Sequence, residues 1–216
     1  MPDRGYAPVS TVLRAARIAN SVAFALQGYF LAVILTELPQ LRDRLGLSDN
    51  TILIIVMAIS VVAAAGSLLA EQMAVRWSSR TALCTGLAAI TIAGLIFAVA
   101  PGITTGLIAL ICYGLAVGVV DASTNMQAVF IQHGYGRFVF ASFYAAWSAG
   151  TIAGALFVFA CEKAQLTLPY TIAIAAAIVA AAAAISGRRL LGTGRAEADA
   201  GTSESVATVR LRAYLA

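Results

Sequence analysis

One uncharged stretch of the chain carries a stripe of small and polar residues. Its members are spaced four, three and four apart, which places them on one face of a helix: Gly114, Gly118, Asp121 and Asn125. The glycines would let another backbone approach closely, and the carboxylate and amide could bind a proton or a polar solute. The stripe is therefore the first candidate for a functional surface.

Asp121 is the residue of this stripe that most needs a partner. Leaving its carboxylate in hydrocarbon would cost about 2.5–3.5 kcal/mol, so it must face a partner, water or a proton. Two interpretations stay open. Asp121 is either a substrate-binding or proton-titrating carboxylate, or the ion-pair partner of an arginine near the same membrane surface. The candidate arginines are Arg76, Arg80 and Arg137.

A second stretch places Gln27 at its centre, with Asn20 seven residues earlier on the same helical face. A glutamine near the middle of a membrane either bonds to a neighbouring helix or lines a cavity, and both alternatives remain. Asn20 and Gln27 are therefore candidate cavity residues together with Asp121 and Asn125.

A third stretch contains aromatic residues and a packing motif. Tyr144 and Trp147 could line a solute path, or they could anchor and pack the helix. Gly150 and Gly154 form a small-xxx-small pattern, which is a common signal for close helix packing in membranes.

The composition shows what kind of elements must hold these residues. Of the 216 residues, 61% are apolar and 11% are charged, whereas a soluble domain has roughly 25% charged residues. This composition indicates an integral membrane protein and argues against soluble enzymes, nucleic-acid binders and disordered chains. No metal site, cofactor or catalytic nucleophile is expected, because the only histidine, His133, lies in a connection and the cysteines have no metal-binding spacing.

The apolar runs between charged residues predict six transmembrane helices, because about 20 apolar residues cross a bilayer. They are expected near residues 15–38, 51–75, 82–99, 104–128, 138–160 and 166–186. The fold class is therefore an all-α membrane protein. Residues 1–14 are predicted to be a cytoplasmic N-terminus, residues 15–190 the transmembrane domain, and residues 191–216 a flexible cytoplasmic tail.

The distribution of arginine and lysine predicts the orientation. Eleven basic residues lie on the side that holds both ends of the chain, and three lie on the other: Arg42, Arg44 and Lys163. Both termini are therefore expected in the cytoplasm. Polar residues gather on the first, fourth and fifth helices, a pattern typical of two three-helix units that form an inverted repeat.

Several segments resemble the N-terminal half of a major facilitator superfamily transporter, in the subgroup of bacterial sugar/fucose-permease-like and uncharacterised inner-membrane permeases. The segments that carry this resemblance are residues 37–49 (ELPQLRDRLGLSD), 71–80 (EQMAVRWSSR), 114–125 (GLAVGVVDASTN), 136–137 and 147–150. The resemblance covers roughly residues 12–190. It implies the cytoplasmic membrane of a bacterium as the location.

The superfamily has a gating loop between its second and third helices, and residues 71–80 depart from the pattern of that loop. Arg76 and Arg80 match its basic positions, but Val75 stands where the superfamily has an acid. Glu71 could substitute by pairing with one of the two arginines.

The resemblance also implies a function. A complete member has twelve helices, with the substrate site between two six-helix halves. We therefore expect a half-size secondary transporter for a small solute, embedded in membrane lipid, that pairs with a second six-helix half or with itself. The alternative is a non-transporting truncated relative or an accessory membrane subunit. The sequence does not indicate the substrate.

Overall fold

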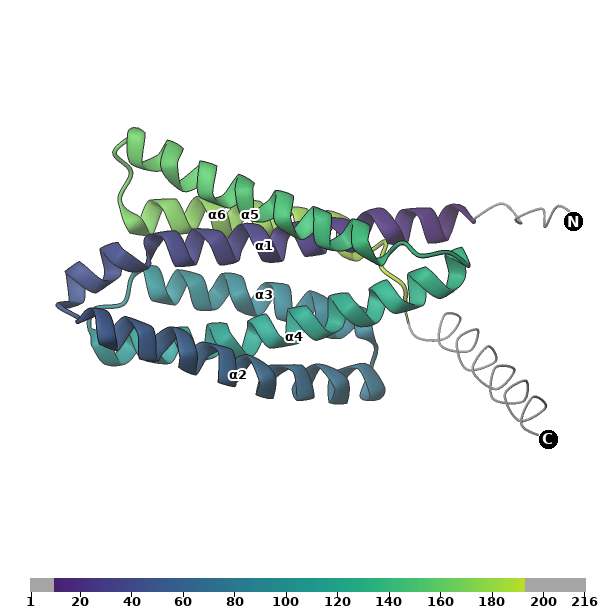
Figure 1. The fold of residues 1–216 in the computed structure, drawn as a ribbon, viewed down its shortest axis with the longest axis horizontal. Helices are drawn as coiled ribbons and strands as arrows, with labels where there is room; N and C mark the ends of the chain where they lie inside the picture. The colour runs from purple at the N-terminus through teal and green to yellow at the C-terminus, as the bar shows by residue number, and fades with distance from the viewer. Residues whose placement is uncertain (1–9, 193–216) are drawn as a thin grey trace, which may run out of the picture.

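The computed structural model describes residues 10–192, and this part of the chain is helical with no strands. Its six helices form one bundle (Figure 1), and each is long and apolar enough to cross a membrane. They are α1 (Thr11–Leu45), α2 (Asp49–Arg76), α3 (Ser79–Ala98), α4 (Ile103–Tyr135), α5 (Phe140–Lys163) and α6 (Leu168–Gly187). The predicted fold class is therefore confirmed. The N-terminal residues 1–9 and most of the predicted tail, residues 193–216, lie outside the described part.

Two helices run further than their apolar stretches. α1 continues through Glu37 and Pro39 to Leu45, beyond the predicted end at residue 38, and its last turns bend away from the earlier ones (Figure 1). A proline inside a helix removes one backbone hydrogen bond and commonly causes such a bend. α4 continues to Tyr135 instead of ending near residue 128. Charged and polar residues limit the hydrocarbon span, but they do not stop a helix.

The ends of α1 and α4 are set by glycine. Gly46 and Gly136 follow the two helices with φ of 64° and 61°. This left-handed conformation favours glycine and is a common way to end a helix.

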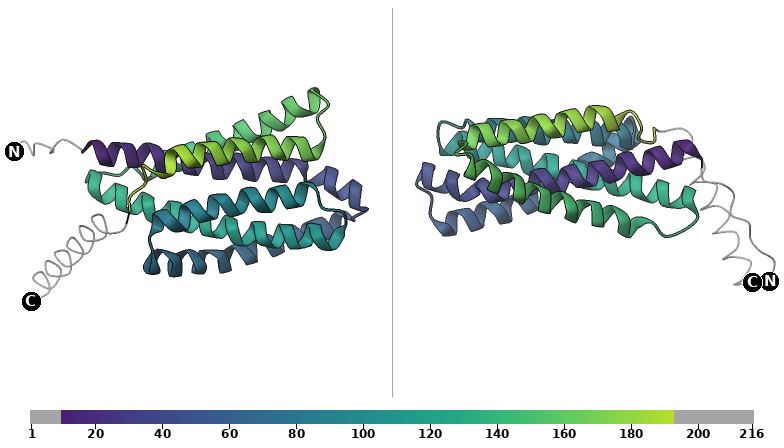
Figure 2. Two further views of the ribbon diagram at one scale, coloured as in Figure 1. Left: turned by 180° about the vertical axis from the view of Figure 1, so that it is seen from behind. Right: turned by 90° about the horizontal axis from the view of Figure 1, so that it is seen from above.

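The closest helix pairs join the first three helices to the last three. α1 packs most extensively against α5, and α4 against α2. α3 lies against α4 and α6, and α1 also lies against α6 (Figures 1 and 2). Exchanging the two three-helix units therefore maps α1–α5 onto α4–α2 and α3–α4 onto α6–α1, and leaves the α3–α6 pair unchanged, which fits one half of a major facilitator fold.

Glycines allow the close approach of α2 and α4. A Cβ atom on Gly118 would collide with the carbonyl oxygen of Ala63, and one on Gly66 would lie 3.1 Å from the Cα of Gly118. One turn away, a Cβ on Gly114 would lie 3.1 Å from the carbonyl oxygen of Ile59. The two backbones therefore touch where the sequence stripe begins.

The same arrangement holds α1 against α5. Cβ atoms on Gly150 and Gly154 would collide with backbone carbonyl oxygens of α1, that of Ala25 in the first case. In the opposite direction, a Cβ on Gly28 would collide with the carbonyl oxygen of Trp147. Both tight crossings are thus built from glycines on the two facing helices.

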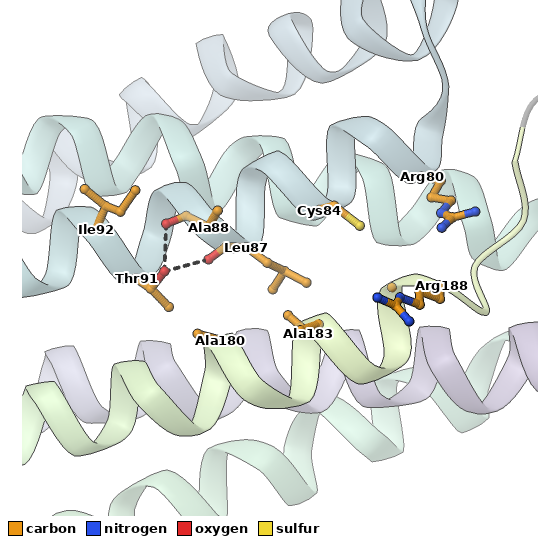
Figure 3. A pocket seen from close by; sticks show the side chains of 11 residues that line it. Arg80, Cys84, Leu87, Ala88, Thr91, Ile92, Ala180, Ala183 and Arg188 are labelled. Carbon is orange, nitrogen blue, oxygen red and sulfur yellow. Dashed lines mark hydrogen bonds between the residues drawn. The ribbon is translucent and has the colours of Figure 1, made fainter.

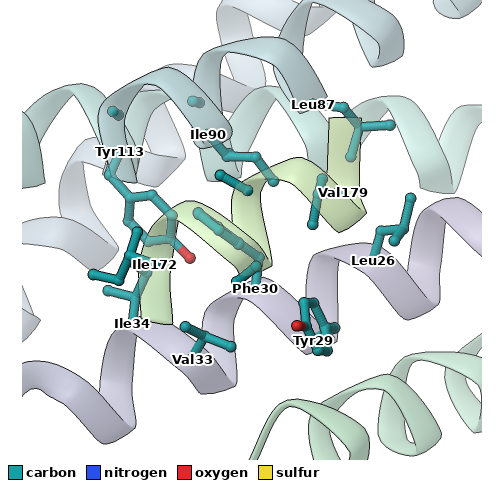
Figure 4. Packing of buried hydrophobic residues seen from close by; sticks show 14 of the residues in the cluster. Leu26, Tyr29, Phe30, Val33, Ile34, Leu87, Ile90, Tyr113, Ile172 and Val179 are labelled. Carbon is teal, nitrogen blue, oxygen red and sulfur yellow. The ribbon is translucent and has the colours of Figure 1, made fainter. Parts of the chain in front are cut away.

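The main apolar core lies where α1, α3, α4 and α6 meet. Phe30 of α1 is fully buried there among Ile90, Tyr113, Ile172 and Val179 (Figure 4). The helices α3 and α6, which have few polar residues, therefore form one side of this core. The polar residues of α1, α4 and α5 lie on another side.

The two ends of the bundle differ in charge. One end holds the start of α1, the α2–α3 and α4–α5 connections and the end of α6 (Figures 1 and 2). We call it the arginine-rich end. Among the described residues it carries Arg14, Arg17, Arg76, Arg80, Arg137, Arg188 and Arg189, and the opposite end carries Arg42, Arg44 and Lys163.

Candidate functional site

The candidate polar side chains of three helices meet on one face of the bundle. We call them the polar cluster: Asn20 and Gln27 of α1, Asp121 and Asn125 of α4, and Tyr144 of α5. Gln27 Nε2 donates to Asp121 Oδ1 at 3.2 Å. The Tyr144 hydroxyl donates to Asn125 Oδ1 at 3.3 Å, and Asn125 Nδ2 donates to the backbone carbonyl of Asp121 at 2.8 Å. Gln27 and Tyr144, 117 positions apart in the chain, thus belong to one hydrogen-bonded group.

The cluster is buried on the α1 side and open on the other. Asn20 is fully buried and Gln27 is 6% exposed, whereas Asp121 is exposed and Tyr144 is 50% exposed. The cluster therefore forms one wall of a polar surface that faces away from the bundle.

Two buried acceptors of the cluster have unused hydrogen-bonding capacity. Asn20 Nδ2 donates to the carbonyl of Thr124 at 3.1 Å, but Asn20 Oδ1 has no partner among the described residues. Gln27 Oε1 also lacks one there. Buried polar groups are normally hydrogen-bonded, so these oxygens mark positions where water or a solute could donate.

Asp121 does not pair with an arginine in the described part of the chain. The ion pairs found there involve Arg42, with Asp43 and Asp49, at the opposite end of the bundle. The ion-pair interpretation of Asp121 is therefore wrong for this structure. The reason is its position. The neighbouring polar group is Gln27 on α1, so Asp121 is partnered by an amide.

Aromatic rings of α1 and α5 pack beside the polar cluster. The ring of Phe24 stacks on that of Phe143 with centroids 5.5 Å apart, and it meets the ring of Tyr144 edge-on at 5.7 Å. Trp147 is half-buried and packs against the same apolar group. Trp147 thus contributes packing, while Tyr144 turns its hydroxyl towards the cluster.

The pairing of Glu71 with Arg76 or Arg80, which could have replaced the missing acid of the gating loop, is not formed among the described residues. Glu71 is exposed and has no ion pair there with Arg76 or Arg80. The Arg76 guanidinium lies over the Trp77 ring, 5.6 Å from its centroid. Glu71 lies on α2, well before the connection, so it does not take the place of the missing acid.

A glutamine holds this end of the bundle together instead. Gln127 of α4 is fully buried, and its Nε2 donates to Ser79 Oγ at 2.8 Å and to the carbonyl of Leu191 at 2.7 Å. Its Oε1 accepts from the backbone N–H of Leu191 at 3.1 Å. One side chain therefore joins the start of α3 and the segment after α6 to α4.

Sequence reasoning missed Gln127 and a buried acid, Glu37. Glu37 is 1% exposed near the far end of α1, and its Oε2 has no hydrogen-bond partner in the described part. Glu37 is the charged residue that ends the first apolar run, and the predicted helix ended one residue after it, at residue 38. The sequence did contain a signal for Gln127, because a polar amide inside an apolar stretch must find a partner. Gln127 was not selected because the helix was predicted to end next to it, near residue 128.

The Gln27–Asp121 contact can be tested by a double-mutant cycle. Side-chain hydrogen bonds between membrane helices average about 0.6 kcal/mol, with a maximum near 1.7. We expect Gln27→Ala and Asp121→Ala to show a coupling energy in this range when unfolding is measured in a mild detergent. The control pair is Arg80→Ala with Asp121→Ala, whose effects should add. Stronger coupling of Asp121 to Arg80 than to Gln27 would contradict the observed arrangement.

Comparison with known proteins supports the same architecture. The chain is 24% identical over 139 residues to an uncharacterised MFS-type (major facilitator superfamily) transporter of Yersinia pestis. The match includes 64% of this chain and 36% of the length of that relative. No family model matches the chain. The similarity and the six apolar helices together fit one half of a major facilitator fold.

Proposed function

We propose that this chain forms one six-helix half of a secondary transporter, not an enzyme, and that it helps to move a small polar solute across the cytoplasmic membrane of a bacterium. The observation that carries the proposal is the polar cluster, in which a carboxylate, three amides and a phenol meet at one open face of an apolar bundle. The similarity to an MFS-type transporter supports the same class.

The polar cluster supports binding of a solute that both donates and accepts hydrogen bonds. The Asp121 carboxylate and the orphan oxygens of Asn20 and Gln27 are acceptors. The Asn125 amide supplies a donor, because its bond to the Asp121 carbonyl uses only one of its two N–H groups. Asp121 is the carboxylate of this cluster, so it is the proposed site at which a proton or a cationic part of the solute binds.

We propose that a second six-helix bundle covers the open face of the polar cluster. A carboxylate and amides facing lipid would cost several kcal/mol, and a second protein surface removes that cost. α5 supports this location, because it exposes a small residue at every fourth position beside the cluster: Ala141, Ala145, Ala149 and Ala153. Small residues let another helix approach closely. The proposed second half, or a second copy of this chain, then closes the cavity at mid-membrane.

The orientation is part of the proposal. In the described residues the arginine-rich end carries seven basic side chains and the opposite end three. Loops rich in lysine and arginine stay in the cytoplasm. The arginine-rich end, with the start of α1 and the end of α6, is therefore proposed to face the cytoplasm.

Cysteine cross-linking tests the pairing. In a variant without Cys84, Cys112 and Cys161, we expect Asn125→Cys and Ala149→Cys to cross-link to another six-helix bundle in native membranes, because both positions face the proposed cavity or its rim. The measurement is a gel shift followed by peptide mapping, which identifies the partner.

Ile178→Cys is the matched control, since Ile178 is exposed on α6, which does not contribute to the polar cluster. Cross-linking of Ile178→Cys with equal yield would indicate random collision. Free reaction of Asn125→Cys with a lipid-soluble maleimide, without cross-linking, would favour a non-transporting accessory role.

A further inference from the structure

A groove between α3 and α6 opens on the side of the bundle away from the polar cluster. It has a volume of about 380 Å³ and runs towards the arginine-rich end (Figure 3). α3 supplies Arg80, Cys84, Leu87, Ala88, Thr91 and Ile92, α6 supplies small residues, and Arg188 follows directly after α6. The groove therefore has a long apolar part and a charged end.

The apolar part offers a ligand few polar side-chain groups, which are the Cys84 thiol and the Thr91 hydroxyl. Its α6 wall consists of alanines, including Ala180 and Ala183, and its α3 wall includes Leu87 and Ile92. The hydroxyl of Thr91 donates to backbone carbonyls of its own helix, at 2.7 Å to Ala88 and 3.2 Å to Leu87. Such walls favour a hydrocarbon chain, which needs no hydrogen bonds.

The charged end holds two arginines without a carboxylate partner in the described residues. Figure 3 shows Arg80 of α3 and Arg188, just after α6, across from one another at this end. Neither takes part in an ion pair with a described residue. Guanidinium groups bind phosphate through two parallel N–H bonds, and two of them can hold one phosphodiester from both sides.

We propose that this groove is a specific binding site for an anionic phospholipid of the adjoining leaflet. The phosphate lies between Arg80 and Arg188, and one acyl chain lies along the alanines of α6. The two arginines lie at the end of the membrane-spanning helices, where phosphates of the bilayer are found, and the groove continues from them along the helices. Basic pockets between helices on the cytoplasmic side bind anionic lipid headgroups in the same way. This inference concerns the outer α3–α6 side and does not depend on transport.

Lipid binding to the purified full-length chain tests the proposal. Native mass spectrometry would compare palmitoyl-oleoyl phosphatidylglycerol with the matching phosphatidylcholine. A basic residue near an anionic lipid contributes roughly a fivefold gain in binding, so the double variant Arg80→Gln/Arg188→Gln should bind phosphatidylglycerol roughly 25-fold more weakly. The matched control is Arg76→Gln/Arg137→Gln, which removes the same charge at the same end and should leave binding within about twofold.

A second pair of variants tests the groove itself. Ala180→Leu fills the groove with both arginines in place and should weaken binding of phosphatidylglycerol, whereas its neighbour Ala181→Leu lies outside the lining and should not. Glycerol phosphate at millimolar concentration should fail to displace the lipid.

Three results would overturn the proposal. They are equal binding of the two lipids by the unaltered chain, equal losses in the groove and control variants, and displacement by glycerol phosphate, which would identify a site for phosphate alone.

Discussion

Replacing Gly118 or Gly150 with alanine is expected to destabilise the bundle by about 3 kcal/mol or more for each change. The added Cβ would collide with a backbone carbonyl oxygen, that of Ala63 in α2 for Gly118 and that of Ala25 in α1 for Gly150. Inserting one carbon into a well-packed site costs typically 1–3 kcal/mol, and a backbone atom can move away less easily than a side chain. Thermal unfolding in detergent, followed by fluorescence-detected size exclusion, would measure the loss.

Gly134→Ala is the matched control on the same helix as Gly118. Its Cβ would lie 2.8 Å from the end of the Leu13 side chain, which can rotate away. Alanine also favours a helix over glycine by up to about 1 kcal/mol, so this variant should be neutral or slightly more stable. A similar loss in Gly134→Ala and Gly118→Ala would mean that the crossings of α1 with α5 and α2 with α4 do not control stability.

These crossings also show how far the sequence predicts the fold. The number and type of helices follow from the thickness of a bilayer, and the small-xxx-small spacing of Gly150 and Gly154 indicates a contact. The spacing does not say which helix makes that contact. The identity of the contacting helix depends on how the two three-helix units pack together, with α1 against α5 and α4 against α2. That packing is a property of the whole bundle.

The members of the polar cluster could be predicted from the sequence, but the hydrogen bonds between them could not. Polar residues inside apolar stretches must face a cavity or a partner, so Gln27, Asp121 and Asn125 could be selected from the sequence. One of the two interpretations of Asp121 gave it an arginine partner, because opposite charges attract. In the structure α1 lies beside α4, and the rotation of the two helices brings Gln27 to the carboxylate.

The ends of the helices were the least predictable part. The first helix was predicted to end near residue 38, just after the charged Glu37, but a helix can continue wherever its side chains reach water or a buried position. Glu37 is buried on α1, and α4 runs past its predicted end near residue 128, next to Gln127. The contact from Gln127 to Leu191 joins residues 64 positions apart, so no local pattern could indicate it.

Gln127→Leu is expected to destabilise the arginine-rich end by about 2–5 kcal/mol. The change keeps the size and burial of the side chain but removes its bonds to Ser79 and to both backbone groups of Leu191. A buried polar group left without its partner costs about 1–3 kcal/mol. The buried Ser79 hydroxyl and the half-buried N–H and C=O of Leu191 would all lose theirs. The amide hydrogen of Leu191 should then exchange with solvent much faster, which hydrogen–deuterium exchange of the intact chain would detect.

Gln72→Leu provides the control for this prediction. Gln72 is exposed on α2 near the same end, so its replacement should change neither thermal stability nor exchange at Leu191. The two variants make the same chemical change, and only one of them breaks the link from α4 to the segment after α6. If exchange at Leu191 stays slow in Gln127→Leu, that segment is held by apolar packing, for example of Leu190 in the main core, and not by the amide.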